Sequence, residues 1–108
     1  MNNHIFSKGN GGFLEIYYSK HLLQRLEIRK FPQNLPRTVF LEAEKRFIDV
    51  VTGHRIAVKK MNYGGKERFI IVAYDILNKG IMIITCHPIE EKQVENRINS
   101  GRWSLERE

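Results

Sequence analysis

A chain of 108 residues suits one domain with a single hydrophobic core, and its 42% hydrophobic and 28% charged residues are ordinary globular values. Eighteen lysines and arginines against twelve acidic residues give a net charge of +6, which favours polyanionic partners such as RNA, DNA or an anionic surface. The single cysteine excludes an internal disulfide and a four-thiolate zinc site. Because no segment has the apolar run of a signal peptide or a membrane span, we expect a soluble, cytoplasmic protein without a membrane partner.

The first part of the chain divides into a tail, a strand and a helix. Asparagine and glycine are frequent in residues 1–12, which we expect to form a flexible tail before a single domain over residues 13–108. The segment FLEIYYS predicts a short strand, and Ser19 is suited to cap the helix that follows it. In that helix, over residues 20–30, Leu22, Leu23 and Leu26 form the buried stripe, bordered on one side by His21, Arg25 and Arg29.

The remaining elements complete an α+β pattern. A second helix is predicted after Pro36 and before the turn at Thr52-Gly53, since Val39, Phe40, Ala43 and Phe47 recur at helical spacing. Strands are predicted over residues 54–63, 68–76 and 81–87, and a last helix over 89–103. Short connections between the strands indicate antiparallel pairing. The predicted fold is α+β, with two N-terminal helices packed on one face of an antiparallel β-meander of about four strands, and a C-terminal helix.

Polar residues end the most apolar strand, GIMIITCHP. Alternation along it would place Ile81, Ile83, Thr85 and His87 on one face, and Met82, Ile84 and Cys86 on the other. In a meander the start of the preceding strand lies beside the end of this one, which predicts Arg68 as a neighbour of Thr85 and His87. If that face meets the first helix, these residues approach His21, Arg25 and Arg29.

Such a cluster has the parts for cleaving RNA without a metal ion. That reaction needs a base for the ribose 2′-OH, an acid for the leaving oxygen and fixed positive charge on the phosphate. His21 and His87 would share proton transfer, because histidine titrates near neutral pH. Arg25 and Arg68 would hold the phosphate, and Thr85 would orient His87 or a phosphate oxygen.

Further basic and aromatic residues are candidate nucleic-acid contacts, namely Arg29, Lys59, Lys60, Tyr63 and Arg102. Each also has a structural interpretation: strand-edge lysines block edge pairing, and tyrosines complete a sheet. Cys86 is interpreted as a small buried residue. The histidines and the cysteine lack the spacing of metal ligands, so we expect no metal and no cofactor.

Taken together, HLLQR on the first helix, the basic strand RIAVKK, RFIIVAY and the closing IITCHP resemble the barnase–EndoU–colicin–RelE class of small ribonuclease domains. The resemblance covers residues 13 to 103 and is closest to the phage- and toxin-associated branches of the class. It implies metal-independent endoribonuclease activity that leaves a cyclic phosphate. The positions that match the class's cleft are His21, Arg25, Arg68, Thr85 and His87.

Two alternatives remain open. One is a non-catalytic nucleic-acid-binding module of the same fold, which would bind RNA in a salt-dependent way without cleaving it. The other is a protein-interaction domain whose basic cleft is covered by an acidic, antitoxin-like partner protein.

Overall fold

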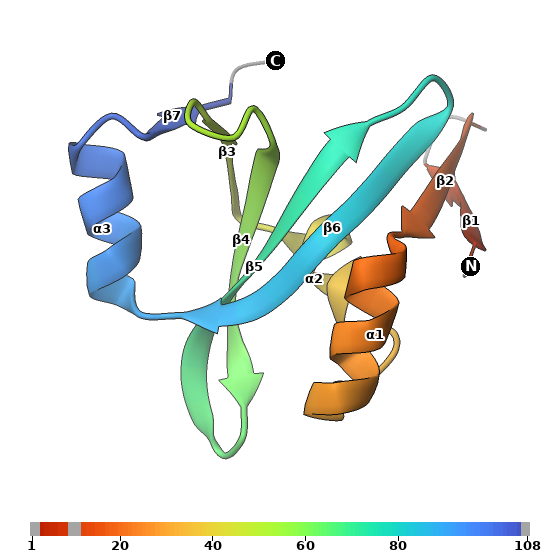
Figure 1. Ribbon diagram of the computed structural model, residues 1–108, viewed down its shortest axis with the longest axis horizontal. Helices are drawn as coiled ribbons and strands as arrows, with labels where there is room; N and C mark the ends of the chain where they lie inside the picture. Colours follow the sequence, from red (N-terminus) through yellow and green to blue (C-terminus); the bar gives the residue numbers. More distant parts are fainter. Residues whose placement is uncertain (1–2, 9–11, 107–108) are drawn as a thin grey trace.

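The computed structural model describes residues 3–8 and 12–106 of the chain. These residues form three helices and seven strands, with all the strands in one sheet (Figure 1). In chain order the elements are β1 (Asn3–Lys8), β2 (Gly12–Tyr18), α1 (Lys20–Arg29), α2 (Leu35–Glu42), β3 (Lys45–Asp49), β4 (Arg55–Tyr63), β5 (Lys66–Ile76), β6 (Gly80–Ile89), α3 (Glu91–Asn99) and β7 (Trp103–Leu105).

The sheet is mixed. Its strand order is β1-β2-β6-β5-β4-β3-β7, and all neighbours are antiparallel except β2 and β6, which run parallel. A Cβ atom on Gly80 would lie 2.0 Å from the carbonyl oxygen of Glu15, so the parallel pair can approach this closely only with glycine at that position. The apolar strands β5 and β6 lie inside the sheet with neighbouring strands on both sides, a position typical of strands with continuous apolar runs.

Each face of the sheet carries its own hydrophobic core. The first core lies beneath α1 and α2 and includes Leu22, Leu26, Val39 and Ile70. The second core lies on the opposite face, where Phe47, Ile71, Val94 and Trp103 bring β3, β5, α3 and β7 together. Burying each of these large apolar side chains contributes about 1.5–3 kcal/mol to folding.

The predicted arrangement of the sheet and helices was wrong. A meander of about four antiparallel strands is replaced by seven strands with one parallel pair. The two N-terminal helices contact different strands of that sheet: α2 lies against β4 and β5, whereas α1 lies alongside β6 (Figure 1). The α+β class itself is retained.

Two of the additional strands, β1 and β3, are formed by segments that were predicted to be a tail and a helix. Residues 3–8, within the expected tail, form β1 and pair with β2, while residues 1–2 and 9–11 lie outside the described part of the chain. Residues 45–49, predicted as helix, form β3. The α2 helix ends at Ala43, which has an extended ψ of 136°, and Glu44 then donates its backbone N–H to the Val58 carbonyl.

The apolar spacing that suggested a longer helix serves two different faces. Val39 and Phe40 belong to the first core, whereas Phe47 belongs to the second. A single helix could not deliver these side chains to opposite faces of the sheet. The helix capped by Ser19 and the three central strands are confirmed with small shifts of their ends. The last helix is confirmed over Glu91–Asn99, but its predicted end at residue 103 was wrong, because Trp103 begins β7. Within residues 3–8 and 12–106, no helix is long and apolar enough to cross a bilayer.

Candidate functional site

Helix α1 lies alongside β6 because the chain leaves the sheet at Ser19. Strand β2 pairs with β6 only as far as Ile83. The Ser19 backbone N–H then donates to the Ile83 carbonyl at 3.0 Å. The Ser19 hydroxyl accepts a hydrogen bond from the Leu22 N–H at 3.0 Å and donates to the Ile84 carbonyl at 3.2 Å. The remaining length of this β6 edge faces α1 instead of another strand (Figure 1).

A β-bulge interrupts β6 at the same point. Ala73 of β5 pairs with Thr85, but Tyr74 pairs with Ile83, so Ile84 is the extra residue. The prediction that Ile81, Ile83, Thr85 and His87 share one face was therefore wrong, although Thr85 and His87 remain on the same face as each other. Ile83 points into the first core. Thr85 lies on the opposite face of the sheet, together with its partner Ala73, which belongs to the second core.

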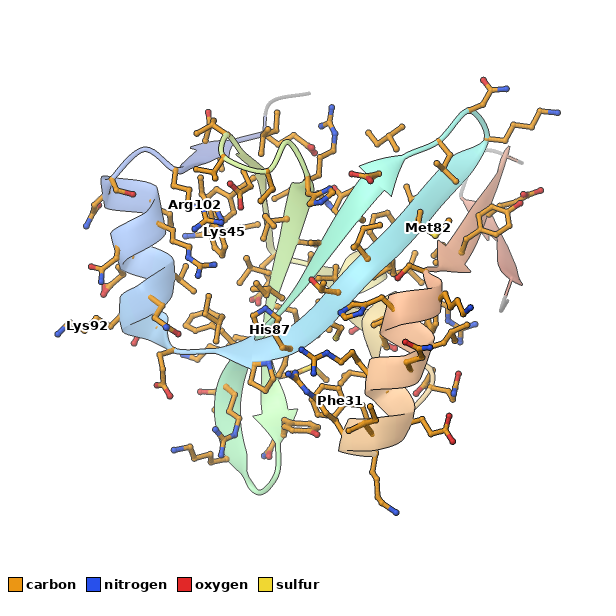
Figure 2. The ribbon with its side chains drawn as sticks, viewed as in Figure 1. Phe31, Lys45, Met82, His87, Lys92 and Arg102 are labelled. Atoms are coloured by element: carbon orange, nitrogen blue, oxygen red, sulfur yellow. The ribbon has the colours of Figure 1, made fainter. Side chains whose placement is uncertain are left out.

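Between α1 and this edge of β6 is a hollow of about 60 Å³, called here the small hollow. A hollow at the edge of a strand collects residues from both of the strand's faces, so the bulge does not separate its lining. Five of the site residues predicted from the sequence line the small hollow. One of them, His87, is labelled in Figure 2 on the part of β6 that faces α1. The complete lining is His21, Leu22, Arg25, Arg29, Ile84, Thr85, Cys86 and His87.

In the described part of the chain, the basic side chains of the small hollow form no ion pair. Within residues 3–8 and 12–106, no hydrogen bond or ion pair engages the side chains of His21, Arg25 or Arg29, and none of the lining residues is acidic. Four basic side chains elsewhere are paired with carboxylates, in the ion pairs Arg55–Glu106, Lys59–Glu42, Lys60–Glu67 and Arg102–Asp49. An anion entering the small hollow would therefore meet two available guanidinium groups.

The tautomer of neutral His87 is fixed by its own neighbour. The Nδ1 atom of His87 lies 2.9 Å from the carbonyl oxygen of Pro88. A carbonyl can only accept a hydrogen bond, so Nδ1 must carry the proton in this contact. Neutral His87 then has its lone pair on Nε2, the nitrogen that a general base would use.

Cys86 is a structural part of the lining. Its side chain is 5% exposed and belongs to the first core. Burial raises the pKa of Cys86 to about 12, and the nearby charge of Arg29 offsets this only in part. The thiol is protonated at neutral pH, which removes the thiolate that a nucleophile needs.

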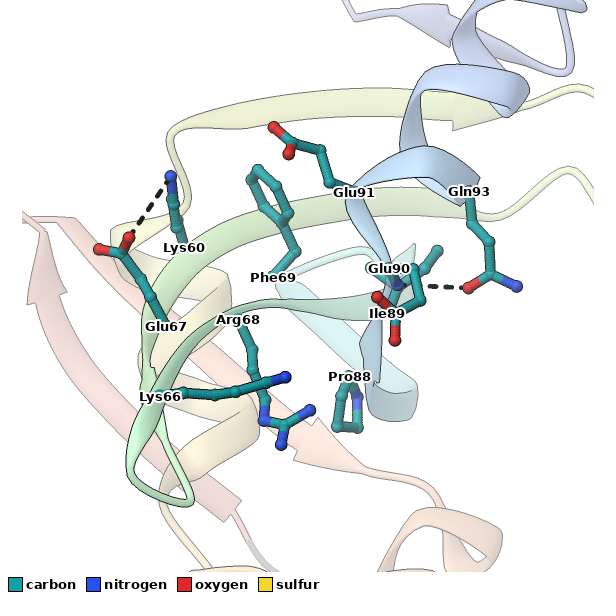
Figure 3. Close-up of a pocket in the computed structure, with 10 residues that line it drawn as sticks. All are labelled: Lys60, Lys66, Glu67, Arg68, Phe69, Pro88, Ile89, Glu90, Glu91 and Gln93. Atoms are coloured by element: carbon teal, nitrogen blue, oxygen red, sulfur yellow. Dashed lines mark hydrogen bonds and ion pairs between the residues drawn. The ribbon is translucent and has the colours of Figure 1, made fainter.

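Arg68 lies outside the small hollow. The register of β5 and β6 places Ile71 opposite His87, whereas Arg68 pairs with Met61 on β4. Its Nε donates to the Tyr63 carbonyl at 3.1 Å. Arg68 instead lines a second, larger hollow of about 440 Å³, which Figure 3 shows.

The other predicted nucleic-acid contacts are distributed over the molecule. Lys60 lines the larger hollow, whereas Lys59 is paired with Glu42 across β4 and α2. Tyr63 packs edge-to-face on Phe31, with ring centroids 5.4 Å apart. Arg102 is held by Asp49. Of the five, only Arg29 lines the small hollow.

Sequence reasoning missed two features of the site. The first is the bond from Ser19 to Ile84, because a cap is recognisable locally but its contact with a strand sixty-five residues away is not. The second is Phe69, whose apolar character indicated only a strand but whose ring lines the larger hollow. In the described part of the chain, no group of three or more His, Cys, Asp or Glu residues could hold a metal ion.

Comparisons with protein-family models, curated proteins and solved structures found no match to this chain.

Proposed function

We propose that the small hollow binds a backbone phosphate of RNA and that the protein is a metal-independent endoribonuclease. One observation carries the proposal: two guanidinium groups without acidic partners and two imidazoles line one hollow that holds no carboxylate. The resemblance to the barnase–EndoU–colicin–RelE class supports the same activity.

The phosphate would be held by α1. The long side chains of Arg25 and Arg29 begin one helical turn apart on the exposed side of α1 that borders β6. A hollow of about 60 Å³ is small, which suits a single phosphate group better than a base. The guanidinium groups would stabilise the extra negative charge of the phosphorane-like transition state.

Proton transfer would be divided between the two histidines. His87 Nε2 takes the proton of the ribose 2′-OH, and the 2′-oxygen forms a bond to phosphorus. The P–O5′ bond breaks, and the leaving 5′-oxygen receives a proton from the His21 imidazolium. The products are a 2′,3′-cyclic phosphate and a free 5′-hydroxyl. General acid–base catalysis of this kind contributes about 10²–10⁴-fold to the rate.

The test is cleavage of single-stranded RNA in the presence of EDTA, measured from pH 5 to pH 9. We expect cyclic-phosphate products and a bell-shaped pH profile for the unaltered protein. His21→Ala and His87→Ala should each lower the rate by about 100-fold or more. His54→Ala is the matched control, since His54 is paired with Asp75 outside the small hollow and its loss should leave the rate unchanged.

Two results would contradict the proposal. One is intact RNA at every pH, which together with salt-dependent binding would make the protein a non-catalytic RNA-binding module. The other is cleavage that His21→Ala and His87→Ala leave at the level of His54→Ala.

A further inference from the structure

The larger hollow lies directly beyond the small hollow along β6. It is formed by the start of β5, the end of β6 and the first turn of α3, and its volume of about 440 Å³ is in the range of ligand sites. His87 lines the small hollow, and the next residue, Pro88, lines the larger one. A chain molecule with one group in the small hollow can therefore place its next unit in the larger hollow.

The larger hollow has two sides of different chemistry. Figure 3 shows Lys66 and Arg68 extending toward Pro88, the side next to the small hollow. Phe69 and Glu91 lie on the other side, toward α3. Lys66 has no ion-pair partner among the described residues.

The floor on the second side is an aromatic ring. Phe69 is half-buried, and the Lys60 ammonium lies 5.7 Å from the centre of its ring. Lys60 is itself paired with Glu67, with 3.5 Å between Nζ and Oε1. Glu91 adds carboxylate oxygens that can accept hydrogen bonds from a flat ligand stacked there.

This division of charge favours a nucleotide over simpler ligands. A ligand that is anionic throughout would be repelled by the carboxylates toward α3, and an apolar ligand would desolvate Lys66 and Arg68 without compensation. A nucleotide matches both sides, because its phosphate is anionic and its base is flat with polar edges.

We infer that the larger hollow is the subsite for the nucleotide that adjoins the phosphate bound in the small hollow, and this inference rests on the proposed function. The base stacks on Phe69, and its phosphate contacts Lys66 and Arg68. Because a base in a duplex is stacked between its neighbours, the substrate is single-stranded at this position.

The test is binding of a fluorescein-labelled tetrauridine with 2′-O-methyl riboses, which cannot be cleaved through a 2′-OH, measured by fluorescence anisotropy. Phe69→Leu keeps apolar volume in the second core but removes the stacking surface, and should weaken binding about five-fold or more. Phe69→Tyr retains the ring and should bind as the unaltered protein does. Arg68→Ala should weaken binding and lower the salt slope by about 0.7.

Lys92→Ala is the matched control. It removes one positive charge, as Arg68→Ala does, but Lys92 is exposed on α3 and points away from the sheet (Figure 2). Binding within two-fold of the unaltered protein is expected. Equal losses for Arg68→Ala and Lys92→Ala, or unchanged binding by a folded Phe69→Leu, would overturn the inference.

The outcome also separates this inference from the proposed function. Binding that depends on Phe69 and Arg68, in a protein that leaves unmodified RNA intact, would support the subsite and contradict the nuclease. Histidine-dependent cleavage combined with binding that ignores Phe69 would do the reverse.

Discussion

Asp49 is a buried charge that organises the C-terminal end of the sheet. It is 3% exposed and accepts hydrogen bonds from the Arg102 guanidinium and from the backbone N–H groups of Val51 and Thr52. Burial raises the pKa of Asp49, but the bonds from Arg102 and the two backbone groups outweigh it and hold the pKa below its usual value. Because it donates to Asp49, the Arg102 guanidinium is held within the fold.

Asp49→Asn should therefore destabilise the protein in a pH-dependent way. At pH 7 we expect a loss of about 2 kcal/mol in the free energy of unfolding, measured in urea, because the charged acceptor is removed. A carboxyl with a lowered folded pKa stabilises the fold above its unfolded pKa of about 3.9, and this contribution is lost as the pH falls through the folded value. The difference between the two proteins should shrink below pH ~4.

The matched control is Asp75→Asn, because Asp75 is partly exposed and is paired with His54. Its effect should be smaller. A constant difference between Asp49→Asn and the unaltered protein from pH 7 to pH 3 would show that the carboxylate charge is not responsible.

At the scale of elements, one residue determines how α1 meets β6. Ser19→Ala removes the cap of α1 and the bond to the Ile84 carbonyl together. We expect a loss of about 1–2 kcal/mol in urea unfolding, most of it from the cap. RNA binding should weaken as well, because α1 carries Arg25 and Arg29 into the small hollow.

Ser19→Thr keeps a hydroxyl and should recover most of the loss, whereas Ser104→Ala, on an exposed position of β7, should stay within about 0.5 kcal/mol of the unaltered protein. Equal stability of Ser19→Ala and Ser104→Ala would contradict this role of the cap.

The elements that could be predicted are those whose pattern is local. The leucine stripe of α1 faces one core, and the continuous apolar runs of β5 and β6 contribute side chains to both cores, so a local pattern identifies each element. Residues 39–47 could not be interpreted in this way, because Val39 and Phe47 contribute to cores on opposite faces. Gly80 resembled an ordinary turn residue, and only the parallel pairing with Glu15 shows why a side chain is excluded there.

The same limit applies to the candidate site. His21, Arg25 and Arg29 follow from helical spacing, and their approach to Thr85 and His87 was predicted for a shared face of β6. They meet for a different reason: β6 pairs with β2 only as far as Ile83, and beyond the bulge at Ile84 the same edge of β6 faces α1. A bulge adds one residue without a clear signal in an apolar run, so alternation counted through it assigns the wrong face.

At the scale of the whole molecule, the net charge of +6 is not evenly available. Arg55, Lys59 and Arg102 each lie beside a carboxylate, which reduces the field they project into solvent. Arg25 and Arg29 are exposed and have no such partner among the described residues. Binding of a polyanion should therefore depend on which cation is removed, and not only on the total charge.

The salt dependence of the proposed RNA binding measures this difference directly. Each phosphate contact contributes about 0.7 to the slope of log K against log salt for a single strand. Arg25→Ala and Arg29→Ala should each lower the slope by about that amount, measured by anisotropy between 50 and 200 mM salt. Lys59→Ala removes the same charge from the total, but Lys59 is paired with Glu42, so its slope should not change. If all three variants lower the slope equally, net charge and not the small hollow governs binding.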